Sequence, residues 1–206
     1  MRSELLEIVN GALLGDGCIK FDTYGNKKYY TFKLTAKDIN FLKWVRKKFE
    51  KYKLNCWITH DSNVSNVHSL CFYINSAKYF REELLSLRDK WYKEIRGKTI
   101  KVVPRDLELT PTTLLFWYLG DGSLIRRRND ETRVPHIVFA TNGFLKKDVE
   151  FLRKKLKEIG LNFYIVKDRS LSGFRKKRRT SYLLYSSTED ETVLDFLNIL
   201  ETVQKK

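Results

Sequence analysis

Cysteine is scarce in this sequence. The three cysteines, Cys18, Cys56 and Cys71, are odd in number and scattered, which excludes a complete disulfide framework and favours a reducing compartment. Long apolar runs are also missing, because none approaches the length of a transmembrane helix, and the first residues, Met-Arg-Ser-Glu, do not form a secretory signal. These absences predict a soluble, intracellular protein.

Negative charge is in short supply as well. The 206 residues hold 25 Asp and Glu against 40 Lys and Arg, which leaves a formal net charge of +15. Such a charge destabilises a compact fold by self-repulsion unless a polyanion is the partner. The chain is nevertheless 42% hydrophobic and 14% aromatic, which is the composition of a folded protein. Nucleic acid is the favoured partner, and an anionic membrane surface is the alternative.

A short phrase occurs twice. Residues 9–17 and 114–122 both end in Leu-Gly-Asp-Gly, with Asp16 and Asp121 at equivalent positions. Each acid follows an apolar stretch of helical spacing, so it lies at a helix C-terminus, where an anion is disfavoured. A single Gly-Asp-Gly is explained by a turn at a helix end. Two copies in matching contexts indicate that the acids share a cation.

The similarity continues beyond this phrase. The two aspartates are 105 residues apart, and the segments that start at Phe41 and Asp148 align with an offset of 107. Further on, Phe72 aligns with Leu183 at an offset of about 111. Two copies of this length are too few and too long for a solenoid, so they predict two pseudo-symmetric halves.

Each half shows the same order of predicted elements. Apolar residues of helical spacing are followed by two strands with alternating polarity, an amphipathic helix, two more strands and a last helix. The expected amphipathic and last helices cover residues 38–52 and 77–87 in the first half, and 146–159 and 189–202 in the second. The sequence therefore predicts an α+β fold of two αββαββα halves, residues 1–103 and 104–206, each an antiparallel sheet with helices on one face.

The polar sheet faces and one basic loop are the candidate DNA-binding surfaces, because a twisted antiparallel ribbon fits the major groove. The candidate readers on the sheets are Lys20, Tyr24, Lys28, Lys33, Arg126, Arg127, Arg128 and Arg133. The candidate residues of the loop are Lys167, Arg169, Arg175, Lys176, Lys177, Arg178 and Arg179. A solvated strand face and a localisation signal are the respective alternatives.

Two glycines predict how the acids meet. Gly11 and Gly15 lie four residues apart, on one face of the first helix, and each costs about 1 kcal/mol relative to alanine, which close helix packing would offset. A seam with the second motif helix would bring Asp16 and Asp121 together, and hard cations between two carboxylates suit phosphodiester cleavage. A zinc site is the alternative metal centre. Its candidate ligands are Cys56, His60, His68 and Cys71, of which the last two would point to opposite strand faces.

With these motifs in place, the chain resembles a single-chain LAGLIDADG homing endonuclease of the intron-encoded type. The repeated phrase corresponds to the family's name motif, and the Lys101-Val102-Val103-Pro104 stretch, followed by Leu109-Thr110-Pro111, resembles elements of one branch. The resemblance implies that the LAGLIDADG helices pack at the central interface. It also implies that Asp16 and Asp121 are catalytic metal ligands, and that Lys101 and Asn142 act beside them.

The same resemblance implies a cofactor, partners and a location. It predicts two or three Mg²⁺ ions, for which Mn²⁺ can substitute and Ca²⁺ can bind without supporting cleavage. The expected partner is a long double-stranded DNA target, both strands of which are hydrolysed by a monomer in the cytoplasm of a prokaryote or in an organelle. An intron RNA maturase and a cleavage-inactive DNA-binding protein of the same fold are the alternatives.

Three departures from internal symmetry stand out. Ala36 aligns with Asn142, and Phe116 stands where Gly11 stands, which predicts a ring packed against a glycine. The counterpart of Lys101 would be Lys205 or Lys206, or is absent. We therefore expect the two aspartates to be equivalent in position and unequal in activity.

Overall fold

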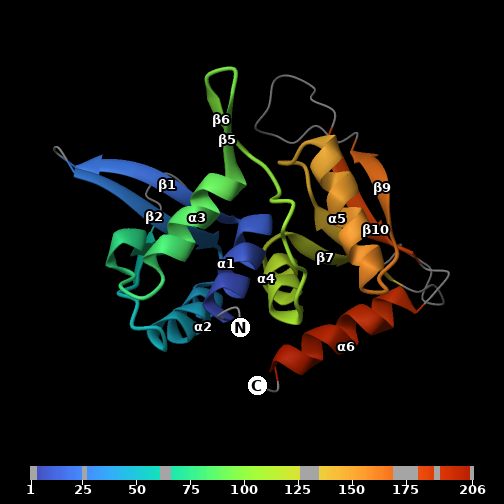
Figure 1. The fold of residues 1–206 in the computed structure, drawn as a ribbon. Coiled ribbons are helices and arrows are strands. Elements are labelled where there is room, and N and C mark those ends of the chain that lie inside the picture. The colour runs from blue at the N-terminus through green and yellow to red at the C-terminus, as the bar shows by residue number, and fades with distance from the viewer. Residues whose placement is uncertain are drawn as a thin grey trace.

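The computed structural model describes residues 4–24, 27–60, 66–125, 135–168, 181–187 and 191–204. Its elements form two αββαββα halves, as predicted (Figure 1). The first half contains α1 (Glu4–Leu14), β1 (Gly17–Tyr24), β2 (Lys27–Ala36), α2 (Ile39–Glu50), β3 (Trp57–His60), β4 (His68–Tyr73), a 3₁₀ turn (Ile74–Ser76) and α3 (Arg81–Trp91). The second contains α4 (Pro111–Asp121), β7 (Gly122–Ile125), β8 (His136–Ala140), α5 (Lys146–Glu158), β9 (Phe163–Asp168), β10 (Ser181–Ser186) and α6 (Thr192–Gln204).

The helix predictions are confirmed with one correction. The amphipathic helices α2 and α5 lie within two residues of their expected bounds. The expectation of a helix over residues 77–87 is wrong, because α3 begins at Arg81 and ends at Trp91. The 3₁₀ turn and the ψ of 71° at Ala77 keep the preceding residues out of the helix. Helix α6 runs to Gln204, and its expected start at residue 189 lies outside the described residues.

Each half has one four-stranded antiparallel sheet, with the strand orders β1-β2-β4-β3 and β7-β8-β10-β9. Gly17 pairs with Leu34 in the first sheet, and Gly122 pairs with Phe139 in the second, so the halves repeat strand for strand. The expected offset of about 111 for the last strand is wrong. Leu34 pairs with Leu70, whereas Phe139 pairs with Leu184, which gives an offset of 114 and reverses which residues face the core.

The helices cover one face of each sheet. Phe32 of β2 packs against Phe49 of α2, and Phe139 of β8 stacks on Trp117 of α4 with 3.8 Å between ring centroids. We call the opposite face of each sheet, which is directed away from these helices, its outer face. The predicted start of α4 is confirmed, because the Thr110 side chain accepts a hydrogen bond from the Thr113 amide and Pro111 follows the cap.

A short hairpin, β5 (Tyr92–Ile95) and β6 (Lys98–Lys101), was not expected from the sequence. It connects the first half to the segment that leads into α4 and protrudes between the two halves (Figure 1). Arg96 and Gly97 both have positive φ angles, 52° and 68°, as the tightest hairpin turns require. Of the described helices, none is long and apolar enough to cross a membrane.

Candidate active site at the crossing of two helices

Helices α1 and α4 lie side by side at the centre of the molecule (Figure 1). Glycines permit their closest approach: a Cβ on Gly15 would lie 3.2 Å from the Gly120 Cα, and a Cβ on Gly120 would lie 3.2 Å from the Asp16 amide nitrogen. Because the two glycines touch, the acids that follow them, Asp16 and Asp121, project from one place. The predicted helix seam is therefore present.

Phe116 occupies the seam opposite Gly11, but its Cβ and not its ring lies against the glycine, which corrects the expected ring–glycine contact. A Cβ on Gly11 would lie 2.5 Å from the Thr113 carbonyl oxygen and 2.7 Å from the Phe116 Cβ. The Phe116 ring stacks on Trp44 of α2, with 5.5 Å between centroids and an interplanar angle of 13°. The ring therefore joins α4 of the second half to α2 of the first, while the glycine makes room for its Cβ.

Lys101 reaches this seam from the end of β6. Its Nζ donates to the carbonyl oxygens of Gly17, at 2.8 Å, and Gly15, at 3.2 Å. These two carbonyls flank Asp16 at the C-terminal end of α1, where a cation is favoured. Burial lowers the pKa of Lys101 to about 8, although the neighbouring carboxylates counteract this effect. Lys101 is therefore a hydrogen-bonded and largely buried cation, not a solvated charge at the end of a strand.

The two carboxylates and the ammonium group interact. Burial and, to a smaller extent, the negative charge of Asp16 raise the pKa of Asp121 to about 7, although Lys101 opposes both effects. The Asp16 side chain remains in contact with solvent, but partial burial of its carboxylate raises its pKa, and Lys101 again counteracts the change. Because the charge of Asp16 disfavours the ionisation of Asp121, a divalent hard cation between the two carboxylates would be favourable.

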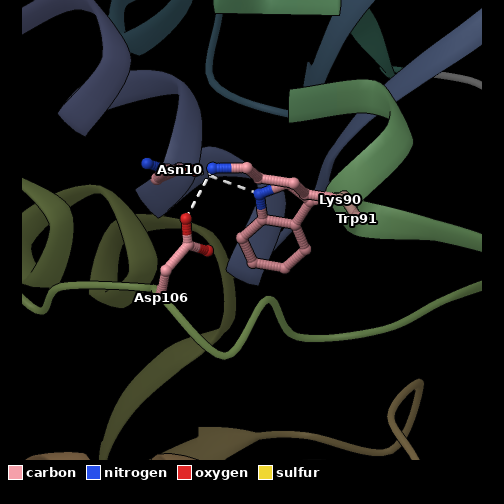
Figure 2. Close-up of polar contacts among 4 residues, drawn as sticks. All are labelled: Asn10, Lys90, Trp91 and Asp106. Atoms are coloured by element: carbon pink, nitrogen blue, oxygen red, sulfur yellow. Dashed lines mark hydrogen bonds and ion pairs between the residues drawn. The ribbon is translucent and has the colours of Figure 1, made fainter. Parts of the chain in front are cut away.

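Polar contacts hold the elements around the seam (Figure 2). Trp91 at the end of α3 donates its Nε1 hydrogen to the Asn10 Oδ1 of α1 at 3.0 Å. Beside it, Lys90 forms an ion pair with Asp106 of the segment that leads into α4 (Figure 2). The Tyr92 hydroxyl of β5 accepts from the Ile19 amide of β1 at 2.9 Å. These contacts fix the hairpin against the first half and thereby position Lys101.

Asn142 lies just after β8. Its exposed side chain donates to the Asp168 Oδ2 of β9 at 2.7 Å. The expectation that Ala36 is its counterpart is wrong. Because Gly17 pairs with Leu34 and Gly122 with Phe139, the equivalent position is Lys37, and Ala36 corresponds to Thr141. A participation of Asn142 in the site stays a prediction.

The candidate DNA-contacting residues are only partly described. Lys20 is exposed and Lys33 is half-buried, both on the outer face of the first sheet. Lys167 belongs to β9 instead of the expected loop, and the alternation of that strand places it on the same face as Phe163 and Ile165. Tyr24 ends β1 and Lys28 lies in β2. The other DNA-contacting candidates lie outside the described residues: Arg126, Arg127, Arg128, Arg133, Arg169, Arg175, Lys176, Lys177, Arg178 and Arg179. So do Lys205 and Lys206, the possible counterparts of Lys101.

The zinc alternative gains no support. His60 and His68 face each other across β3 and β4, with 5.1 Å between ring centroids. The residues with described positions form no group of three or more His, Cys, Asp or Glu suited to a metal ion. Sequence reasoning missed one set of surface residues, the aromatic side chains of the outer faces. Trp57 packs on Tyr73 at 4.7 Å, and Tyr164 packs on Tyr185 at 5.9 Å.

Comparisons with known proteins agree with this architecture. The chain matches the LAGLIDADG DNA endonuclease family over residues 6–193. It is 30% identical over 171 residues to the uncharacterized protein MJ1098 of Methanocaldococcus jannaschii, which covers 81% of the chain and 61% of that protein. It is 24% identical over 200 residues to the cytochrome b mRNA maturase bI2 of Saccharomyces cerevisiae, which covers 94% of the chain and 44% of that protein. The chain thus spans less than two thirds of either relative.

Solved structures share the fold. The homing endonuclease I-WcaI bound to its DNA recognition sequence is 20% identical, with a TM-score of 0.67, and the match covers 97% of this chain and 82% of that one. The homing endonuclease I-DmoI in complex with DNA and Mn is 15% identical, with a TM-score of 0.57 and 96% of each chain covered. At these identities the likeness establishes the arrangement of elements.

Proposed function

Because the chain belongs to the LAGLIDADG DNA endonuclease family, we propose that it hydrolyses both strands of a long, specific double-stranded DNA target. The observation that carries this proposal is the crossing of α1 and α4, where Gly15 touches Gly120. The crossing joins an acid from each half and Lys101 into one composite site. In the proposal, the halves 1–103 and 104–206 straddle the duplex, and one chain suffices.

Asp16 and Asp121 would hold the divalent cations, for which we propose Mg²⁺. Such a cation, when bound, supplies charge stabilisation for the attacking and leaving oxygens of the phosphodiester. Lys101 contributes a second positive centre, which the carbonyls of Gly15 and Gly17 hold in place. Since its pKa is about 8, its ammonium group exchanges a proton readily near neutral pH.

The test begins with a target selected by cleavage from randomised DNA, because base contacts depend on register and DNA shape. Purified protein with Mg²⁺ should linearise a plasmid that carries this target. Asp16→Asn and Asp121→Asn should each abolish cutting while DNA binding is retained. Affinity should fall steeply with salt, by about a thousandfold between 50 and 200 mM if at least six phosphates are contacted. Loss of binding together with cutting would show that the acids hold the fold instead.

A second candidate function is assistance of intron RNA splicing. The observation that favours it is the similarity to a yeast mRNA maturase over 94% of the chain. In this proposal the basic surface binds intron RNA. A splicing assay with an intron RNA that encodes this chain tests it. Splicing that requires the protein, without any cleavage of DNA, would support this candidate and contradict the nuclease proposal.

A further inference from the structure

The outer faces of the two sheets differ in chemistry, although the strands are equivalent. In the first sheet, Thr35, Ser69 and Thr59 form a row of hydroxyl groups across three paired strands, in which Ser69 is buried and Thr59 is exposed. The hydroxyls of Thr35 and Ser69 lie 3.1 Å apart. The equivalent row of the second sheet is Ala140, Leu183 and Val166. Each hydroxyl-bearing residue thus has an apolar counterpart.

The same replacement holds for the cationic residues. Lys33 pairs with Cys18 as Val138 pairs with Ser123, so Lys33 and Val138 are equivalent. Lys20 corresponds in the same way to Ile125, which is 40% exposed. Asp168 is the charged residue among the described residues of the second outer face. Its carboxylate already accepts from the Asn142 amide and from the Ser181 hydroxyl at 3.2 Å.

Aromatic rings complete the second outer face. His136 lies 5.9 Å from Tyr185 and 6.4 Å from Tyr164, measured between ring centroids. The rings border the apolar row, because Tyr185 pairs with both Val138 and Tyr164. Among the described residues, the middle of this face is therefore a row of aliphatic side chains without hydrogen-bonding groups, and rings that carry polar atoms border it on the side of the sheet that would meet the DNA.

Apolar side chains distinguish base pairs in only one way. The major-groove edges of guanine, cytosine and adenine are hydrogen-bond donors and acceptors, and covering them with aliphatic groups leaves them unpaired at a free-energy cost. The C5-methyl group of thymine is the one apolar feature in that groove. Resting on the proposed DNA function, we propose that the second sheet recognises its half of the target through thymine methyl groups, whereas the first sheet reads its half by hydrogen bonds.

The test uses a selected target in which every thymine of one half-site, or of the other, is replaced by deoxyuridine, which lacks only the methyl group. Affinity is measured by fluorescence anisotropy in EDTA, so that nothing is cut. Each buried methyl group contributes about threefold to fourfold in affinity, so two or more contacts predict a loss of about tenfold in one half-site. The other half-site should bind almost unchanged.

A matched pair of variants assigns the effect to the second sheet. Val166 and Thr59 are equivalent and nearly isosteric. Val166→Thr therefore replaces a methyl group by a hydroxyl group in the second sheet, and Thr59→Val makes the reverse change in the first. Val166→Thr should reduce the loss of affinity that deoxyuridine causes in the half-site of the second sheet. Thr59→Val should leave that loss unchanged and add a smaller loss in the opposite half-site. Thermal melts confirm that both variants fold.

The outcomes separate the two proposals. Equal penalties in both half-sites, or none in either, overturn the thymine inference while a cleaved target still supports the nuclease function. A penalty that Val166→Thr leaves unchanged also overturns it. Failure to select any DNA target, or a preference for RNA, overturns both proposals together.

Discussion

At the scale of single residues, Lys101 is the side chain on which the site's positive charge depends. Its Nζ bonds two carbonyls beside Asp16, so Lys101→Met removes the cation while keeping most of the side chain's bulk. We expect the cleavage rate to fall by about a hundredfold or more, with target affinity nearly unchanged. Single-turnover cleavage and a binding titration measure both. Lys98→Met, on the same strand, is the control, and an equal loss there would contradict a specific role.

Asp121 makes the stability of the metal-free protein depend on pH. Its folded-state pKa of about 7 lies above the ordinary value of 3.8, so the folded state holds a proton that the unfolded chain releases. This contribution to stability is lost as pH rises through about 7. Asp121→Asn should therefore raise the free energy of unfolding at pH 8 by on the order of 2 kcal/mol, and have little effect near pH 4.

Urea unfolding in EDTA at the two pH values tests this expectation. Asp89→Asn, an exposed acid on α3, is the control and should change little at either pH. A wild-type protein that is more stable at pH 8 than at pH 6, with no gain from Asp121→Asn, would refute the assignment. Mg²⁺ added at pH 8 should raise the melting temperature of the wild type and not that of the variant.

Particular residues show how much of the structure could be predicted from the sequence. The repeated Leu-Gly-Asp-Gly predicted two equivalent halves, the spacing of apolar residues predicted their elements, and Gly11 with Gly15 predicted the seam that brings Asp16 near Asp121. The register of the last strand was not predictable, because Leu183 and Leu184 are both apolar and either could face the core. Lys37 was missed for a related reason: Thr35 aligns equally well with Thr141 until the cross-strand pairs are known.

At the scale of elements, the fit of α1 against α4 decides the geometry of the site. Alanine normally stabilises a helix by about 1 kcal/mol relative to glycine. At Gly11 a Cβ would lie 2.5 Å from a backbone oxygen of α4, so the helices must separate. Gly11→Ala should therefore destabilise the protein by about 1–3 kcal/mol and slow cleavage.

Gly143 supplies the matched control, because a Cβ there meets nothing within 4 Å. Gly143→Ala should change the free energy of unfolding by less than about 0.5 kcal/mol. It should leave the cleavage rate unchanged. Chemical denaturation of the two variants makes the comparison. If Gly11→Ala were as stable as the wild type, helix propensity would outweigh the close contact, and the seam would be looser than the distances indicate.

The hairpin β5–β6 is the element that could not be predicted from the sequence. Tyr92–Ile95 continues directly from α3, and a four-residue strand with one apolar position at its end gives no recognisable alternation. Arg96-Gly97 is a turn signal, but nothing in the sequence says that the turn brings Lys101 back to β1. Tertiary contacts such as Tyr92 with the Ile19 amide supply that information.

At the scale of the whole molecule, the pseudo-twofold symmetry is broken at the proposed active site. Lys101 bonds the carbonyls of Gly15 and Gly17, but in the described part of the chain no lysine bonds the equivalent carbonyls of Gly120 and Gly122. Among the described residues, the lysine of the composite site therefore lies on the side of the first half. A symmetric pair of acids with an asymmetric cation predicts that the two DNA strands are cut at unequal rates.

A supercoiled plasmid with one target site resolves the two cuts. Nicked circles should accumulate before linear DNA appears, and end-labelled duplexes should show the same strand cut first in most molecules. Lys101→Met should slow the faster strand more than the slower one and so reduce the difference, because the variant removes what distinguishes the halves. Equal strand rates in the wild type would refute this prediction. A difference that survives Lys101→Met would place its origin elsewhere, in the contrasting outer faces of the two sheets.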